Sequence, residues 1–278
     1  MADEAKKSNS IVETIKTVVY ALLIAGIFRT IFFQPFWIPS GSMKDTLLVG
    51  DFLFVNKMAY GYSYASCPTI RIARLGVNID AAGICGFLDG DNTRILGGTP
   101  ERGDIVVFRH PANGTDFIKR VIGLPGDKVQ MKNGVLYLNG TAVQVEDNGV
   151  FEETYAPQGP LSSRPRCENG VVGQGAACFK SRQTETLPDG PSYNILNIAD
   201  QRSDNTSVFT VPEGHYFFMG DNRDNSTDSR FPQTVGGVGF VPYENLIGRA
   251  NRVIFSSAGR SMLFFWTWRS DRFFKGLD

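Results

Sequence analysis

The sequence predicts a mainly β fold outside the membrane and one N-terminal transmembrane helix. Two observations lead to the β fold: Val, Ile, Phe and Tyr come in short bursts of strand length, and 30 Gly and 14 Pro among 278 residues separate the bursts. The third observation gives the helix, because one apolar segment near the N-terminus is long enough to cross a bilayer. A chain of this length can bury one large core or two smaller ones.

The first element is the apolar helix. From Val18 to Phe36 the only charged residue is Arg29, and a helix of this length spans roughly 28 Å, about one hydrocarbon core. A cleavable signal peptide is the alternative, but the apolar run continues to Trp37 without an Ala-x-Ala-like site. We therefore expect a tail over residues 1–16 and an uncleaved anchor over 17–36. A slight excess of lysine before the span places the tail in the cytoplasm.

Past the anchor, short strands alternate with turn signals. Runs with strand length and composition are Asp51–Val55, Asp104–Phe108, Gly134–Leu138 and His215–Met219. Asn-Gly turns and a Gly-, Ser- and Asn-rich stretch set residues 129–211 apart as an inserted second β-region. A core is then expected in two parts, 37–128 and 212–257. Residues 62–99, rich in Gly, Asn and Asp, are interpreted as an inserted loop rather than a domain.

The four cysteines indicate an oxidising compartment. Neither Cys67 with Cys85 nor Cys167 with Cys178 has the C-x-x-C spacing of a zinc or thioredoxin-like motif. Disulfides Cys67–Cys85 and Cys167–Cys178 would each close one Gly-rich loop after the anchor. The alternative is a set of free, buried thiols, because free cysteine behaves as a small hydrophobe.

The C-terminal segment, residues 258–278, has the composition of an interfacial segment. Aromatic residues crowd Met262–Arg269, and cations follow within Arg272–Lys275. Aromatic rings suit the headgroup region and cations suit anionic lipid. A segment that packs on the β-core is an equal alternative.

The charge balance bears on partners. Lys+Arg and Asp+Glu both number 28, so the chain has no net charge. This composition does not indicate a basic face that would bind nucleic acid. The Asp- and Asn-rich stretch Gly220–Arg230 lacks the terminal Glu of an EF-hand loop. We therefore expect no nucleic acid, no metal and no cofactor.

A candidate nucleophile, Ser42, follows the anchor directly. A serine hydroxyl is a poor nucleophile until a base takes its proton, and the usual base is histidine. The only histidines are His110, in a turn, and His215, at the start of a strand, so a Ser-His-Asp triad is the less favoured interpretation. The remaining base is a lysine whose pKa has been lowered by burial.

Lys119 has the flanks of such a lysine. Alternation in a buried strand would place it on one face with Phe117 and Val121. Lys44 and Lys57 are rivals, although a solvated or snorkelling amine is the usual state of a lysine.

Three motifs together resemble bacterial type I signal peptidase, a family of membrane-bound serine endopeptidases. They are Pro39–Leu48 (PSGSMKDTLL), Thr115–Asp127 (TDFIKRVIGLPGD) and Gly220–Arg230 (GDNRDNSTDSR), and they occur in the family's order. The resemblance implies that Ser42 is the nucleophile and Lys119 the general base. Its supporting positions are Ser40 in the oxyanion hole, Ser226 orienting the lysine, and Asp228 and Arg230 near the site. Asp45 departs from the family's usual proline, which affects the local turn.

The resemblance also implies a fold, a substrate and a location. Family members have an antiparallel β-fold catalytic core with an inserted second β-domain. They remove signal peptides from exported preproteins, after small residues at −1 and −3, at the phospholipid membrane. We expect a single-pass monomer of the bacterial inner membrane with a periplasmic catalytic domain. The alternatives are an anchored, non-catalytic β-domain that binds exported chains or lipids, and a Ser/Lys peptidase that matures one dedicated substrate.

Overall fold

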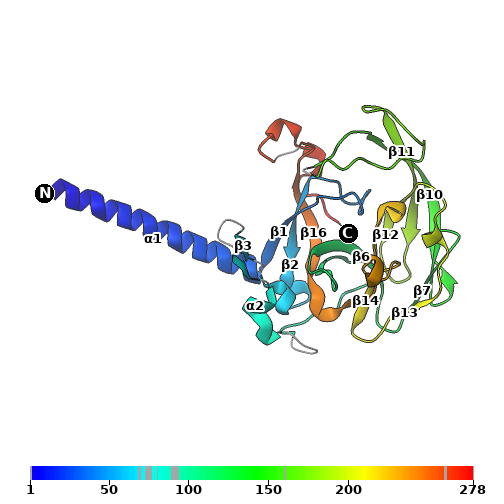
Figure 1. Cartoon of the computed structure of the whole chain (residues 1–278), viewed down its shortest axis with the longest axis horizontal. Coiled ribbons are helices and arrows are strands. Elements are labelled where there is room, and N and C mark those ends of the chain that lie inside the picture. The colour runs from blue at the N-terminus through cyan, green and yellow to red at the C-terminus, as the bar shows by residue number, and fades with distance from the viewer. Residues whose placement is uncertain are drawn as a thin grey trace.

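A long N-terminal helix projects from a β-rich body in the computed structural model (Figure 1). The structure describes residues 2–67, 70–72, 77–79, 81–88, 94–159, 161–259 and 262–277. Helix α1 spans Ala2–Ile31, and its segment Ile11–Arg29 has a mean hydropathy of 1.9 and is not buried against the rest of the protein. This segment is long and apolar enough to cross a bilayer once.

The helix ends before the expected limit of the anchor at Phe36. Strand β1 (Phe33–Trp37) follows it and pairs antiparallel with β2 (Asp51–Asn56). Trp37 of β1 stacks on Phe52 of β2, and Phe36 packs against an apolar core, so the hydropathy of this stretch reflects a strand as well as the span.

The largest sheet holds the first and last parts of the chain together. Its order is β1-β2-β16-β5-β6-β14-β15, and all its pairs are antiparallel. The strands not yet defined are β5 (Ile105–Arg109), β6 (Asp116–Gly123), β14 (His215–Met219), β15 (Val241–Pro242) and β16 (Leu246–Ser256). Two apolar cores flank this sheet, one containing Met43, Leu47 and Val107 and the other Val106, Phe108 and Phe218.

Residues between β6 and β14 form two smaller sheets. One has the order β13-β7-β8-β9 and the other β10-β11-β12. Their strands are β7 (Lys128–Lys132), β8 (Val135–Leu138), β9 (Thr141–Ala142), β10 (Gln144–Thr154), β11 (Ala177–Thr186), β12 (Ser192–Asn197) and β13 (Phe209–Thr210). One core cluster joins Leu136 and Ile195 of these sheets to Phe217 of β14, so the inserted region packs directly on the larger sheet.

Residues 62–99 contain more regular structure than a loop. They include a short hairpin of β3 (Ile70–Ile72) with β4 (Val77–Ile79), and helix α2 (Ala81–Cys85). A disulfide joins Cys67 to Cys85, and the Tyr62 hydroxyl donates a 2.6 Å hydrogen bond to the Ile31 carbonyl at the end of α1. The segment therefore braces the junction between helix and sheet.

The C-terminal segment has an end that packs on the β body and an aromatic part that is exposed. Its end packs on the body: Arg272 forms a two-point ion pair with buried Asp51, at 2.9 and 2.5 Å, and Leu277 enters the apolar core. Its aromatic part is exposed, with Leu263, Phe265 and Trp266 each more than two-thirds accessible.

Candidate active site

Ser42 lies in a turn between β1 and β2 that is fixed on both sides. Met43 and Leu47 are almost fully buried in the apolar core below it. From the third motif, the backbone N–H of Asn222 donates to the Ser42 carbonyl at 3.1 Å, and its side-chain amide donates to the Gly41 carbonyl at 2.8 Å. The serine therefore sits on a turn whose main chain is held from two directions.

Lys119 projects from β6 toward this turn. Its side chain is 3% exposed, and its Nζ lies 2.7 Å from Ser42 Oγ and 3.0 Å from the Ile118 carbonyl oxygen. Two residues 77 positions apart in the chain are thus in hydrogen-bond contact. This is the distance that proton transfer between a nucleophile and its base requires.

Burial is the main reason that Lys119 can lose its proton. It lowers the pKa of the amine to about 8, while the carboxylates of Asp228 and Asp221 oppose the shift. Each of these carboxylates is bound to an arginine instead of to the lysine. A substantial fraction of the amine is therefore neutral close to physiological pH.

The third motif forms the wall behind the two residues. Arg230 binds Asp228 through Nε and Nη2, at 2.9 and 3.0 Å, and the Gly220 N–H donates to the same carboxylate at 3.1 Å. Burial opposes ionisation of Asp228, but Arg230 and this N–H hold its pKa below the ordinary value. A Cβ atom at Gly220 would lie 2.3 Å from Ser226 Oγ, so only glycine fits this close approach.

Ser226 is not seen in its expected contact. Its Oγ is buried and has no well-aligned hydrogen-bond partner among the described residues, although it lies close enough to Asp228 to help lower the pKa of that carboxyl. Ser40 is exposed at the rim of the site. The geometry therefore pairs Ser42 with Lys119 and, separately, Asp228 with Arg230. Among the described residues, no hydrogen bond joins Ser40 or Ser226 to Ser42 or Lys119.

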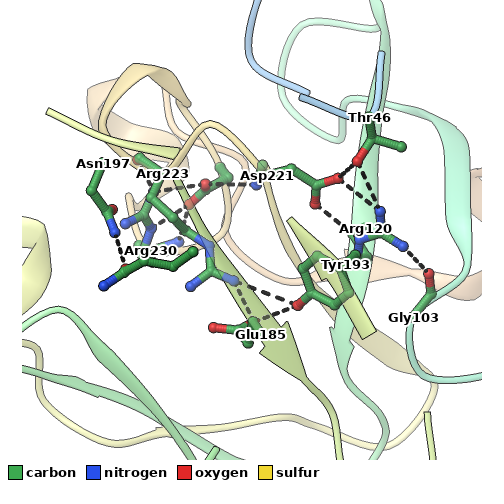
Figure 2. A network of polar contacts seen from close by, with 12 residues as sticks. Thr46, Gly103, Arg120, Glu185, Tyr193, Asn197, Asp221, Arg223 and Arg230 are labelled. Atoms are coloured by element: carbon green, nitrogen blue, oxygen red, sulfur yellow. Dashed lines mark hydrogen bonds and ion pairs between the residues drawn. The ribbon is translucent and has the colours of Figure 1, made fainter. Parts of the chain in front are cut away.

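A buried ion-pair network that sequence reasoning missed supports the site (Figure 2). Arg120, the neighbour of Lys119, binds Asp221 through two hydrogen bonds of 2.9 and 2.7 Å and stacks 3.9 Å above the Tyr193 ring. The Tyr193 hydroxyl and Arg223 both donate to Glu185 of β11. Arg120 lies in the second motif and Asp221 in the third, so these two residues could have been singled out from the sequence. Glu185 lies in no motif and could not.

A cavity of about 360 Å³ opens beside Ser42 and Lys119. Its walls are mostly apolar and include Phe36, Ile38, Val107, Phe117, Ile118 and Thr227. An apolar cavity lined by a serine hydroxyl and a lysine amine can accept part of an extended peptide beside the serine.

The other candidate bases face elsewhere. His110 Nε2 contacts the Gly237 carbonyl at 3.1 Å, and His215 Nδ1 contacts the Glu213 carbonyl at 2.9 Å. Lys57 donates to the Ser66 carbonyl at 2.5 Å. Lys44 donates to Glu153 at 2.5 Å, and of the candidates only Lys119 is hydrogen-bonded to Ser42 within the described residues.

Both predicted disulfides are present in the structure. Cys67 is joined to Cys85, and Cys167 to Cys178. Within the described part of the chain, no group of three or more His, Cys, Asp or Glu side chains is arranged to hold a metal ion.

A serine hydroxyl in contact with a buried lysine amine, beside an apolar groove on a β-fold, has the geometry of the serine hydrolases that use an amine as base. Sequence comparison gives the family. The profile described as signal peptidase, peptidase S26, matches residues 11–255. The chain belongs to this family and is a serine peptidase.

Two relatives found by sequence agree with the family profile. Signal peptidase I of Rickettsia typhi is 35% identical over 92% of this chain and 84% of its own length. Signal peptidase I of Rickettsia canadensis is 36% identical over 87% of this chain and 79% of its own. The crystal structure of a signal peptidase I from Enterococcus faecalis V583 has 28% identity and a TM-score of 0.29, covering 55% of this chain and 97% of that one.

Proposed function

We propose that this chain is a membrane-anchored signal peptidase in which Ser42 is the nucleophile and Lys119 the general base. The observation that carries the proposal is the 2.7 Å contact between Ser42 Oγ and the amine of a lysine that burial makes easier to deprotonate. Family membership supplies the signal-peptide substrate, and the site supplies the chemistry.

The reaction proceeds in two halves. Neutral Lys119 takes the hydroxyl proton as Ser42 Oγ attacks the scissile carbonyl, and the resulting ammonium gives a proton to the leaving amine. The Ser42 N–H and the Ser40 hydroxyl donate to the developing oxyanion. Lys119 then takes a proton from the water that attacks the acyl-enzyme ester. It returns this proton to Ser42 Oγ as the ester bond breaks and the cleaved signal peptide leaves with a new carboxylate.

The substrate is an exported preprotein cut after small residues at −1 and −3. The modest size and apolar walls of the cavity beside Ser42 support this specificity. Asp228, Arg230 and Ser226 form the wall that keeps Lys119 in place. Residues 37–128 and 212–257 act as the catalytic core, and 129–211 as a second β-domain packed against it.

The enzyme works at a bilayer. Helix α1 crosses the inner membrane once, with the β body on the periplasmic side, and the exposed side chains of Leu263, Phe265 and Trp266 lie in the headgroup region. Confinement of enzyme and substrate to one membrane raises their effective concentration.

The test is cleavage of a preprotein that carries an Ala-x-Ala site by the full chain in detergent. The wild type should release one product whose new N-terminus follows the second alanine. Ser42→Ala should release none while keeping its melting temperature, and a large residue at −1 should block the wild type. Equal cleavage by wild type and Ser42→Ala would overturn the proposal.

A further inference from the structure

A second buried lysine, Lys44, lies two residues after the proposed nucleophile, and its amine binds a carboxylate instead of the serine hydroxyl. Its side chain is 4% exposed. Its Nζ donates to Glu153 Oε2 at 2.5 Å and to Gln158 Oε1 at 2.8 Å. Its stem runs under Gly41, since a Cβ atom there would lie 3.1 Å from Lys44 Cε. Lys44 therefore links the nucleophile turn to a different sheet.

Glu153 is the anchor point on that sheet. It lies in β10 opposite Cys178 of β11, and the Cys167–Cys178 disulfide closes the connection between the two strands. Its carboxylate also accepts hydrogen bonds from Lys180 of β11 and from the Gln158 amide, the latter at 2.7 Å. A carboxylate held by three donors on a cross-linked sheet is a rigid partner.

The next two residues of the turn also make polar contacts with other parts of the body. Asp45 accepts a 3.0 Å hydrogen bond from Asn194 of β12 and lies 3.7 Å from the Arg182 guanidinium of β11. Thr46 donates to Asp221 at 2.5 Å. Three successive residues of the turn thus bind outside it: Lys44 and Asp45 bind the inserted region, and Thr46 binds Asp221 of the ion-pair network. Of the three, Lys44 is nearest to Ser42 in the sequence.

We propose that Lys44, through its ion pair with Glu153, is a positioning residue. It holds the turn that carries Ser42 at hydrogen-bond distance from the Lys119 amine. The proposal rests on the proposed function, because it concerns the same serine. Placement within a fraction of an ångström matters for attack, and a displacement of about 1 Å at a reacting group can cost roughly 100-fold in rate.

The charges around Lys44 explain why it is a tether and not a base. Burial lowers the pKa of Lys44, and Glu153 opposes that shift while Lys180 and Arg269 add to it. Glu153 in turn keeps a depressed pKa: burial would raise it, but Lys44 and Lys180 outweigh burial. Lys44 and Glu153 therefore face each other as an ion pair, and among the described residues the Lys44 amine makes no hydrogen bond to Ser42.

Lys180 provides a matched control for Lys44. Both lysines are buried and both bind Glu153, so either can be changed to methionine while the carboxylate keeps one cationic partner. Lys180→Met removes the same charge from the same cluster but leaves the connection to the nucleophile turn intact. The two variants therefore share the cost of a lost buried cation, but only Lys44→Met removes a contact between Glu153 and the nucleophile turn.

The experiment compares preprotein cleavage by the full chain in detergent for wild type, Lys44→Met, Lys180→Met and Glu153→Gln, with melting temperatures measured for each. Lys44→Met should lower kcat by roughly 10- to 100-fold with KM little changed, whereas Lys180→Met should stay within about threefold of wild type. Glu153→Gln keeps a hydrogen-bond acceptor for Lys44 and should fall between the two. If Lys44→Met fails to fold, the comparison of the other two variants replaces it. A smaller kcat for Glu153→Gln than for Lys180→Met would then support the role of the Lys44–Glu153 contact in positioning Ser42.

The pH profile separates a tether from a base. In Lys44→Met the plateau of kcat should fall while the midpoint of the acid limb stays at the wild-type value, because Lys119 still titrates. Loss of the acid limb in Lys44→Met would make Lys44 the base and overturn the proposal. Equal kcat losses in Lys44→Met and Lys180→Met, or no loss in either, would overturn it as well. Inactive wild-type enzyme would instead contradict the proposed function.

Discussion

The pocket of Lys119 and the pocket of Lys44 hold the same side chain at the same depth but present different partners to it. Lys119 is 3% and Lys44 4% exposed, and burial is the largest cause of a lowered pKa in both. The amine of Lys119 contacts a hydroxyl and a carbonyl, whereas that of Lys44 contacts a carboxylate. Burial alone does not make a lysine a base, because a carboxylate at hydrogen-bond distance stabilises the ammonium form.

The arginines near Lys119 maintain this difference. Asp221 and Asp228 would be suitable ion-pair partners for the lysine, but Arg120 binds the first and Arg230 the second. Each carboxylate is buried and charged, so it must be paired, and an arginine pairs it through two hydrogen bonds. The site thereby keeps two negative charges nearby without giving Lys119 a salt bridge.

The largest expected effect is the loss of activity in Lys119→Met. Methionine fills a similar volume but accepts no proton, so cleavage of an Ala-x-Ala preprotein should fall by roughly 10⁴-fold or more. The drop should far exceed that of Lys44→Met, measured side by side with the same substrate. Comparable losses in the two variants would remove the distinction between base and tether.

The same variant tests the burial of Lys119 without any substrate. The pKa of this lysine is about 8 in the folded protein against an ordinary 10.5. Between these two values the unfolded chain binds a proton that the folded chain lacks, so this lysine makes the wild type more stable as pH rises. Urea unfolding across this window should show that rise diminished in Lys119→Met, and identical slopes would mean that the amine is not perturbed.

The smallest expected effect belongs to Lys57→Met. Burial lowers the pKa of Lys57 to about 8 as well, with the positive charges of Arg29 and Arg109 contributing. Its amine donates to the Ser66 carbonyl in the segment before Cys67 and makes no hydrogen bond to Ser42 within the described residues. It is therefore not placed to take the serine proton. Preprotein cleavage should stay within about threefold of wild type, because a base acts only within hydrogen-bond reach. A loss approaching that of Lys119→Met, with the fold intact, would show that a lowered pKa matters more than the partner.

Much of the larger sheet could be predicted from the sequence. The run His215–Met219 is strand β14 with the same bounds, and Asp51–Val55 lies within β2, because apolar residues between turn signals mark buried strands. Strand β10 has no such run, since most of its residues are exposed and polar. The sheet order also escaped prediction: β16 lies between β2 and β5 although it is the last strand along the described part of the chain.

The site divides in a similar way. Chemistry alone left Lys44, Lys57 and Lys119 as candidate bases, since each has apolar neighbours in sequence, and the resemblance to a family selected Lys119. What separates them is the partner of each amine, which is a tertiary property. The carboxylate that binds Lys44 comes from a residue 109 positions away in a strand without a motif, and no local pattern could have indicated it.

The most direct test of the central claim is the pH dependence of kcat/KM for preprotein cleavage by the full chain in detergent. The base must be neutral to act, so kcat/KM should rise with pH as Lys119 loses its proton, with an acid limb centred near pH 8. A limb centred near the ordinary histidine value of about 6.5, or activity that does not change with pH, would contradict the assignment of Lys119 as the base.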